Sequence, residues 1–400
     1  MSCACTKGEY KMSNIKIFTD NIEPKALEQV YTLTKQDAFA DCKVRIMPDV
    51  HAGAGCVIGF TANLGDKVIP NIVGVDIGCG MLTVELGNID FDLEALDNFI
   101  NANIASGFNV RQKVAYEFDL TELRCYNELE NAPRLAQSLG TLGGGNHFIE
   151  IDVDSNGNKY LIIHTGSRNL GKQVALLYQN KAIHNIKQLL PQRKRELAQQ
   201  YKTEGREHEI ADALAQLPTP KIPKELCYLE GADRDNYLHD MEICQAWASI
   251  NRHLIARDIC AHLGFVYYAL SNFETIHNYI NFNDNITRKG AISAQKGEKV
   301  LIPLNMRDGC ILGVGKGNED WNCSAPHGAG RLYSRGTAKQ ILTMEEFEES
   351  MEGIYTTSVT EGTLDESAMA YKPINEILDK VGDTIDIVDI LKPIYNFKAH

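Results

Sequence analysis

The stretch T-L-G-G-G-N-H-F-I-E-I-D-V-D-S-N-G-N-K-Y-L-I-I-H-T-G-S-R, residues 141–168, carries the strongest structural signal in the chain. Two apolar runs flank Asn156-Gly157. An Asn-Gly pair in that setting predicts a β-hairpin, because its turn needs residues that accept positive φ. With the turn centred on this pair, His164 faces Ile149. The strand period of two then places His147 and His164 on one face as diagonal neighbours.

The two ends of this hairpin carry groups that suit a metal and a phosphate. His147 follows a Gly-Gly-Gly-Asn loop that ends at Asn146, and His164 precedes Gly-Ser-Arg168. Imidazoles are common metal ligands, while flexible backbone amides and a guanidinium bind phosphate oxygens. The mouth of the hairpin is therefore predicted to be a functional site.

The rest of the pattern predicts an α+β protein with a helical lobe between two sheet-forming regions. Helical spacing runs from Val174 to Leu190, where Pro191 is expected to end the helix, and again from Arg234 to His262. Runs of strand type return after this lobe, at Phe265–Leu270, Val300–Leu304, Cys310–Val314 and, as two strands around Pro393, Ile385–Phe397. Because the motifs spread over most of the chain, residues 1–400 are predicted to form one interlaced mixed-sheet domain, with the lobe at about 172–262.

Composition narrows the class of protein. The net charge of −13 argues against nucleic-acid binding over the whole surface but allows a local basic channel. No run approaches the roughly 20 apolar residues of a membrane span. Met1–Lys11 lacks the apolar core of an export signal, and the eleven cysteines have no disulfide-framework spacing. These features predict a cytoplasmic protein with no membrane partner.

Further candidate ligands lie on both sides of the hairpin. Asp76 and Cys79 occur in V-G-V-D-I-G-C-G-M, where glycines allow a tight bend that can point the carboxylate and the thiolate at one centre. His277, in T-I-H-N-Y-I, is another candidate. Asp, Cys and His are all metal ligands, and their softness suits zinc as readily as manganese.

The segment C-S-A-P-H-G-A-G-R, residues 323–331, places His327 between a proline and two glycines that let a bulky group approach the imidazole. Such a histidine could be a base, a metal ligand or a nucleophile toward phosphorus. Arg331 and Arg335 add planar guanidinium groups suited to phosphate. Asp49, in P-D-V-H-A-G, could orient an imidazole through a hydrogen bond.

Taken together, these blocks resemble the RtcB family of RNA-splicing and RNA-repair ligases, over roughly residues 40–400 and in the family's order. The matching motifs are M-P-D-V-H-A-G at 47–53, V-G-V-D-I-G-C-G-M at 73–81, L-G-G-G-N-H-F-I-E at 142–150, H-T-G-S-R-N-L-G at 164–171, H-N-Y at 277–279, R-K-G-A-I-S-A at 288–294, G-N-E at 317–319, H-G-A-G-R at 327–331 and A-Y-K at 370–372. The resemblance implies an RtcB-type catalytic domain. It also implies a GTP- and Mn2+-dependent ligase that joins RNA 2′,3′-cyclic phosphate or 3′-phosphate ends to 5′-hydroxyl ends.

The resemblance also implies roles for individual residues. His327 would be the nucleophile that carries GMP, oriented by Asp49. Two Mn2+ ions would be held, with Cys79 bridging, by Asp76, Cys79, His147, His164 and His277. GTP would be bound by Asn146, at a phosphate, and at the base by Glu150, Tyr371 and Lys398. RNA phosphates would be contacted by Arg168, Arg331 and Arg335. An archease-like activator is a further partner that the resemblance implies.

One segment departs from the family's pattern. The family usually has P-G-S-M-G where this chain reads Pro303-Leu304-Asn305-Met306-Arg307-Asp308-Gly309, and bulkier residues here could reshape the phosphate or guanine pocket. The alternative function is therefore a metal-dependent RNA-end phosphatase or cyclic phosphodiesterase on the same metal centre. A noncatalytic RNA-binding protein, supported by the basic stretch Arg193-Lys194-Arg195, is a third possibility.

Overall fold

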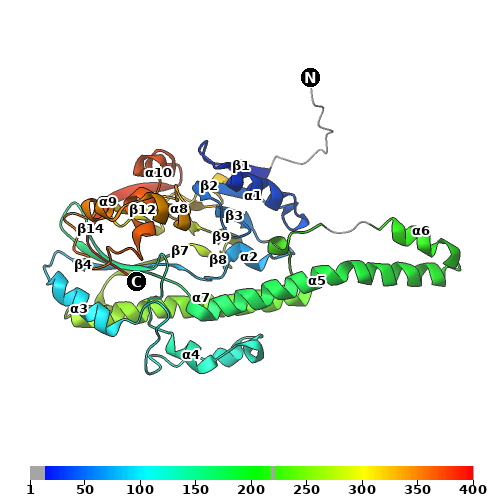
Figure 1. The fold of residues 1–400 in the computed structure, drawn as a ribbon, viewed down its shortest axis with the longest axis horizontal. Coiled ribbons are helices and arrows are strands. Elements are labelled where there is room, and N and C mark those ends of the chain that lie inside the picture. Colours follow the sequence, from blue (N-terminus) through cyan, green and yellow to red (C-terminus); the bar gives the residue numbers. More distant parts are fainter. Residues whose placement is uncertain (1–13, 218–220, 400) are drawn as a thin grey trace, which may run out of the picture.

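The structure, a computed structural model, describes residues 14–217 and 221–399. The segment Met1–Lys11, on which the expectation about export rests, lies outside the described residues. Among those residues, none of the helices combines the length and apolar character needed to cross a membrane. The chain has mixed α+β architecture, as predicted (Figure 1).

Helices and strands are interspersed along the described chain. The helices are α1 (Pro24–Thr34), α2 (Pro70–Val73), α3 (Leu93–Asn103), α4 (Ala132–Gln137), α5 (Arg168–Thr203), α6 (Ile210–Ala215), α7 (Gly231–His262), α8 (Arg335–Ile341), α9 (Met344–Ser350) and α10 (Ile374–Val381). The strands are β1 (Ile15–Ile17), β2 (Val44–His51), β3 (Ile58–Asn63), β4 (Gly80–Gly87), β5 (Phe148–Val153), β6 (Lys159–Thr165), β7 (Asn272–Ile276), β8 (Asn278–Asn281), β9 (Ile286–Lys289), β10 (Ala291–Ser293), β11 (Lys299–Asn305), β12 (Gly309–Gly315), β13 (Ser324–Pro326) and β14 (Ile385–Lys398).

The strands form two large sheets and a short ribbon. A seven-stranded antiparallel sheet has the order β11-β12-β14-β5-β6-β4-β7, a five-stranded sheet has the order β1-β2-β3-β9-β8, and β10 pairs with β13. The edge strands of the larger sheet approach one another, since the backbone amide of Leu301 donates to Thr275 Oγ1 at 3.1 Å. The chain passes from the larger sheet to the smaller between β7 and β8, and His277 is the residue at that crossing.

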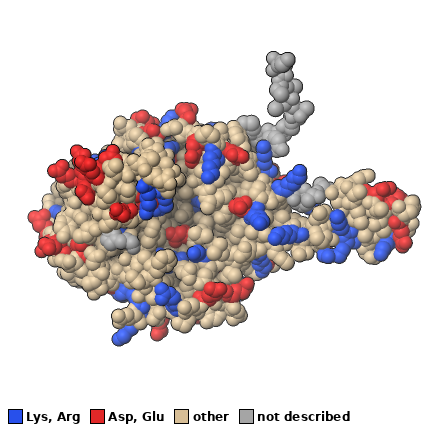
Figure 2. Space-filling model, in the orientation of Figure 1, with Lys and Arg blue, Asp and Glu red and all other residues tan. Residues whose placement is uncertain are grey.

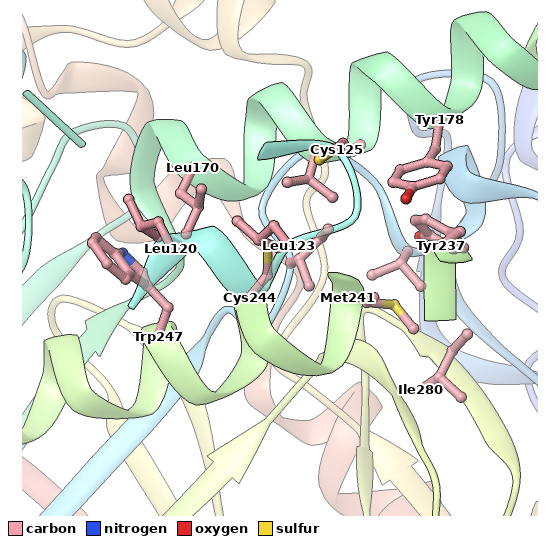
Figure 3. Close-up of a cluster of buried hydrophobic side chains, with 14 of the residues drawn as sticks. Leu120, Leu123, Cys125, Leu170, Tyr178, Tyr237, Met241, Cys244, Trp247 and Ile280 are labelled. Carbon is pink, nitrogen blue, oxygen red and sulfur yellow. The ribbon is translucent and has the colours of Figure 1, made fainter. Parts of the chain in front are cut away.

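Two long helices, α5 and α7, pack beside one another under the sheets, and α5 extends with α6 into an arm (Figure 1). Figure 3 shows the apolar contact between them. Tyr178 of α5 faces Tyr237 of α7, and Leu123 and Cys125 of a covering loop pack against the same cluster. This buried cluster fixes α7 beneath the strands whose ends carry the candidate ligands.

The break predicted at Pro191 is wrong, because α5 continues through it to Thr203. A proline removes the hydrogen bond to the carbonyl four residues earlier, at Lys187. Lys187 and Pro191 are both exposed on the arm, so water can hydrate the freed carbonyl. The helix predicted from Arg234 to His262 is confirmed and starts three residues earlier.

Two strand predictions need correction. Phe265–Leu270 is not a strand; it contains a 3-10 turn at Tyr267–Ala269, because Tyr267 packs against α7 and its hydroxyl bonds to His253. The region predicted as two strands around Pro393 is one strand, β14. Its ladder shifts register between Pro393 and Tyr395, which accommodates a residue without an N–H donor.

The central hairpin exists, but its predicted register is wrong by one residue. His164 pairs with Phe148 rather than Ile149. The loop is five residues long because Asp154 Oδ1 accepts from the backbone amides of Asn156 and Asn158, at 2.8 Å each, and so holds the turn open. Side-chain hydrogen bonds in the turn, rather than the Asn-Gly pair alone, therefore set the register.

Candidate metal and nucleotide site

The candidate metal ligands gather at one edge of the seven-stranded sheet. Cys79 precedes β4 and His147 precedes β5, whereas His164 lies near the end of β6 and His277 follows β7. Neighbouring strands of an antiparallel sheet run in opposite directions, so the start of one strand lies beside the end of the next. These four residues therefore lie at the same end of the adjacent strands β5, β6, β4 and β7. His147 precedes the first paired residue of β5, so the direction of its side chain is not set by the up-and-down alternation of side chains along the strand. It reaches His164 with ring centroids 5.3 Å apart despite the shifted register.

Two overlapping groups of ligand atoms share one thiol. Cys79, His164 and His277 form one group, and Asp76, Cys79 and His147 form the other, with the ligand atoms of each group within 4.8 Å of one another. The Cys79 Sγ lies 3.5 Å from His147 Nε2 and 3.3 Å from His164 Nε2. The structure thus places Cys79 between the two groups, as a bridging ligand would require.

Hydrogen bonds to the far side of two rings leave their Nε2 lone pairs facing the centre. His147 Nδ1 donates to the Leu142 carbonyl at 2.9 Å, and His164 Nδ1 donates to the Asn146 carbonyl at 3.1 Å. These bonds select the tautomer in which Nε2 carries no proton, which is the usual arrangement of a metal-bound histidine. His147 Nε2 then faces the Asp76 carboxylate at 2.9 Å, with two acceptors directed at one point.

The electrostatics of the site favour a bound cation. Burial, reinforced by the Asp76 charge, raises the pKa of the Cys79 thiol well above its usual value. Burial, followed by the neighbouring imidazoles, lowers the pKa of His164 and His277 well below the usual range, so both rings are neutral. Burial opposes ionisation of Asp76, but the electrostatic influence of the adjacent His147 outweighs it and lowers the pKa of the carboxyl. Neutral imidazoles beside a carboxylate and a thiol form a donor set that fits a divalent metal.

Two buried residues of α7 hold the ligand-bearing loops, and sequence reasoning missed both. Arg252 Nη1 donates to the carbonyls of Gly78 and Thr165, at 2.7 and 2.8 Å. Asn251 Oδ1 accepts from the amides of Gly140 and Thr141, at 2.7 and 3.0 Å. Their only sequence signal is the placement of polar residues on the inner face of an otherwise core-forming helix. They couple α7 to loops before β4 and β5 and after β6.

His327 lies next to the metal-ligand set. Its ring centroid is 5.1 Å from that of His277, and its side chain is 21% exposed. The completely buried Asp49 of β2 accepts from both the backbone amide and Nδ1 of His327, at 3.1 and 2.6 Å. Because Asp49 accepts a hydrogen bond from Nδ1–H, the ring tautomer leaves the lone pair of Nε2 free. The structure thus brings together the predicted pair Asp49 and His327.

A cavity of about 320 Å³ opens beside His327. The predicted nucleotide-binding residues Asn146, Glu150, Tyr371 and Lys398 all line it, together with the metal-ligand candidates His164 and His277. Glu150 accepts a hydrogen bond from Asn396 Nδ2, and Lys398 Nζ lies 5.2 Å from the centre of the Phe148 ring. The cavity therefore combines an acidic group, a basic group and an aromatic face, which suits a nucleobase.

Glu366 is a central charge of this cavity that sequence reasoning missed. Its carboxylate accepts from Tyr371 Oη at 2.8 Å and pairs with Lys398 at 3.1 Å, Arg335 at 2.6 Å and Arg331 at 3.4 Å. Burial opposes its ionisation, but these three cations lower its pKa to about 2. The signal in the sequence is its position five residues before Tyr371, within the loop that enters the cavity.

Of the residues in the departing segment, Leu304 and Met306 are buried and line the cavity. Arg307 pairs instead with its neighbour Asp308, Nε to Oδ1, at 2.8 Å, and is not part of the described lining. The Leu304 side chain, which is larger than the small residue usual in the family, therefore takes up space in the cavity wall. The Arg307 guanidinium does not line the cavity.

Asp152 is the most isolated carboxylate next to this cavity. It is fully buried behind Glu150, and neither of its oxygens has a hydrogen-bond partner among the described residues. Burial raises its pKa to about 6, and burial followed by the Asp152 charge raises the pKa of Glu150 well above its usual value. The folded state thus favours the protonated form of Asp152.

We expect Asp152→Asn to stabilise the protein above pH 6, by on the order of 1 kcal/mol or more in the free energy of unfolding. The pKa of Asp152 is higher in the folded than in the unfolded protein, so below pH about 4 the carboxyl is protonated in both states and does not destabilise the fold. As pH rises through 6 the buried group ionises, and wild type loses stability relative to Asp152→Asn. Urea denaturation of both proteins between pH 4 and 8 measures this difference. A gap that is constant across that range would contradict the assignment.

A second cleft, of about 1050 Å³, adjoins the metal-ligand set on its other side. Asp76 and His147 line it, and so do the predicted RNA-binding residues Arg168 and Arg335. A Cβ at Gly166 would lie 2.2 Å from Asp76 Oδ1, so glycine there keeps the carboxylate in place. Figure 2 shows this face hollowed between α8 and α4, with basic side chains on both rims.

The three predicted arginines differ in their freedom to bind a ligand. Arg168 Nη2 donates to the Gly107 carbonyl at 3.0 Å and Nε to Thr141 Oγ1 at 3.1 Å. The Arg331 side chain is mostly buried, and its Nη2 donates to the Asp365 carbonyl at 2.7 Å. Arg335, although paired with Asp365 and Glu366, is half exposed and borders both cavities.

Fold and site together define an α+β protein in which two groups of candidate metal ligands lie beside a histidine that borders a cavity. A family model described as tRNA-splicing ligase RtcB matches residues 29–124 and 126–399. The chain is 29% identical to the RNA-splicing ligase RtcB of Escherichia coli strain K12 over 426 aligned residues, which cover 96% of this chain and 97% of that protein. It is 27% identical to the tRNA-splicing ligase RtcB of Nanoarchaeum equitans, with 83% of each chain covered. The chain belongs to the RtcB family.

Proposed function

We propose that this protein joins RNA ends carrying a 3′-phosphate or 2′,3′-cyclic phosphate to 5′-hydroxyl ends, using GTP and Mn2+. The observation that carries the proposal is the contact of His327 with Asp49 at the edge of a cavity that also borders the metal-ligand set. Phosphoryl transfer through a covalent enzyme intermediate needs such a nucleophile, and a nearby cation site stabilises the charge on the transferred group. Membership of a family whose relatives are named RNA- and tRNA-splicing ligases supports the choice of reaction.

Asp76, Cys79, His147, His164 and His277 would hold two metal ions. When bound, the ions supply Lewis-acid stabilisation of the charge on the phosphoryl oxygens. His277 Nδ1 is buried with no hydrogen-bond partner among the described residues, whereas its Nε2 lies 3.4 Å from Nε2 of His164, so this nitrogen would be the one to bind a metal ion. The donor set accepts zinc as well as manganese; the choice of Mn2+ rests on the family.

His327 would attack the α-phosphorus of GTP through Nε2, forming a phosphorus–nitrogen bond as pyrophosphate leaves. Asp49 would keep the Nδ1 proton in place and stabilise the positive charge that develops on the ring. An RNA 3′-phosphate, formed by hydrolysis where the end is cyclic, then displaces the histidine to give an RNA-(3′)pp(5′)G end. The 5′-hydroxyl attacks this end, and GMP leaves.

Residues of the smaller cavity would recognise the nucleotide. Asn146 would contact a GTP phosphate. Glu150 would accept from the guanine N1–H and 2-amino donors, while Lys398 would donate to O6 and Tyr371 would complete the base site. Those donors and Lys398 would offset the raised pKa of Glu150, because donors to a carboxylate favour its ionised form. The same arrangement would discriminate against adenine, which lacks O6 and the N1 proton.

RNA would occupy the larger cleft. Arg168 and Arg335 border that cleft and would contact its phosphates, and Arg331 would contribute through its contacts with Glu366 and Tyr371. An archease-like activator could assist turnover. The nine cysteines that the structure describes are all free thiols, which supports a cytoplasmic setting. We further propose that residues 1–400 act as one catalytic domain.

The proposal is tested with two RNA strands, one ending in a 2′,3′-cyclic phosphate and the other beginning with a 5′-hydroxyl. Purified protein, GTP and Mn2+ are expected to yield the joined strand, with ATP unable to replace GTP. Phosphate release or opening of the cyclic end without joining would favour a phosphatase or cyclic phosphodiesterase instead. RNA binding without any turnover would favour a noncatalytic role.

A further inference from the structure

The loop after α3 presents a solvent-exposed aromatic side chain at the larger cleft. Phe108 lines that cleft together with Asp76 and His147, and its side chain is 97% exposed. Ser106 to Asn109 form a β-turn, since the Asn109 amide donates to the Ser106 carbonyl at 3.1 Å. Gly107 has φ 62°, a conformation that favours glycine. The turn therefore places Phe108 at its corner, away from the core.

The backbone of this turn is held in place on both sides. Arg168 Nη2 donates to the Gly107 carbonyl at 3.0 Å, and Arg134 Nη2 donates to the Phe108 carbonyl at 2.7 Å. The Gly107 amide donates to the Gly143 carbonyl at 2.8 Å, which ties the turn to the loop that carries His147. The aromatic ring thus stands on a fixed support next to the metal-ligand set.

Positive charge predominates around the ring, since five cationic side chains line the cleft against the three carboxylates Asp76, Asp365 and Glu366. Arg134, Lys172 and Lys339 are exposed and line the same cleft, and Arg335 borders it. Among the residues that the structure describes, neither Arg134 nor Lys172 has a carboxylate within 4.0 Å. Cations that follow a phosphate backbone, combined with an aromatic ring for a base, are the two elements of single-stranded nucleic-acid binding.

We propose that Phe108 is a stacking platform for one unpaired base of the RNA strand whose end enters the metal site. This inference rests on the proposed ligase function and adds a base contact that is independent of base identity. A cleft of about 1050 Å³ lies at the upper end of ordinary ligand pockets, so it has room for more than one nucleotide. Arg134 and Lys172 then bind the flanking phosphates.

Phe108→Ala is expected to weaken binding of a fluorescent single-stranded RNA with a 3′-phosphate by about 5- to 150-fold, measured by anisotropy. Phe108→Trp is expected to stay within about threefold of wild type. The matched control is Tyr268→Ala, which removes an aromatic ring that is 82% exposed and lies outside the cleft. Because stacking is uncharged, the salt dependence of binding should not change, whereas Lys172→Gln should lower its slope by about 0.7.

A set of RNAs with one abasic nucleotide at successive positions identifies the stacked base. Wild type is expected to lose affinity at one position in particular, and Phe108→Ala is expected to be insensitive there. Equal abasic profiles, or an affinity of Phe108→Ala within twofold of wild type, would overturn the inference. Labelling of the protein with GTP, which needs no RNA, separately tests the proposed function and is expected to be unchanged in Phe108→Ala.

Discussion

His327→Ala is expected to abolish both covalent labelling of the protein by α-labelled GTP and RNA joining, with a loss of at least about 10³-fold. The reason is that His327 Nε2 is the proposed attacking atom, so its removal leaves no group to receive GMP. The label in wild type should be acid-labile, as a phosphorus–nitrogen bond is. Labelling is followed by gel electrophoresis after incubation with GTP and Mn2+.

Asp49→Asn refines the same prediction. An asparagine amide would donate to Nδ1 of His327 and so stabilise the tautomer with the proton on Nε2, where it blocks attack. Labelling is expected to fall by about 10²- to 10⁴-fold while GTP binding, measured by calorimetry, persists. His208→Ala, which removes an exposed histidine of the helical arm, is the matched control. Full labelling of His327→Ala would refute the assignment of the nucleophile.

Cys79→Ala is expected to remove metal from both ligand groups, lowering affinity for Mn2+ by more than about 100-fold and RNA joining with it. The thiol belongs to both groups, whereas His147 belongs to one. His147→Ala should therefore retain one ion where wild type holds two and Cys79→Ala holds none. Elemental analysis of Mn2+-loaded, desalted protein gives these ratios.

Cys244→Ala provides the control for this series. Cys244 is as deeply buried as Cys79 but lies in the hydrophobic cluster between α5 and α7 (Figure 3). Its replacement creates a similar cavity without removing a proposed ligand, so metal content should match wild type. Equal metal content in Cys79→Ala and wild type would contradict a bridging thiol.

The hairpin shows how far local sequence can specify a site. The apolar runs and the turn signal correctly indicated that a hairpin carries His147 and His164, but Asp154 widened the loop and shifted the ladder by one residue. The two imidazoles still meet, because His147 precedes the strand and is free of its alternation. The reasoning that joined them was wrong in register although its result was right.

The sequence by itself determined the family, the α+β class and the identity of the candidate ligands, because motif residues and apolar patterns are local properties. Tertiary structure alone decided that Glu366 gathers three cations and that Arg252 ties together two ligand-bearing segments. Those contacts join residues far apart in the chain. No local pattern encodes them, because they arise where strands of two sheets end beside the interior of the buried helix α7.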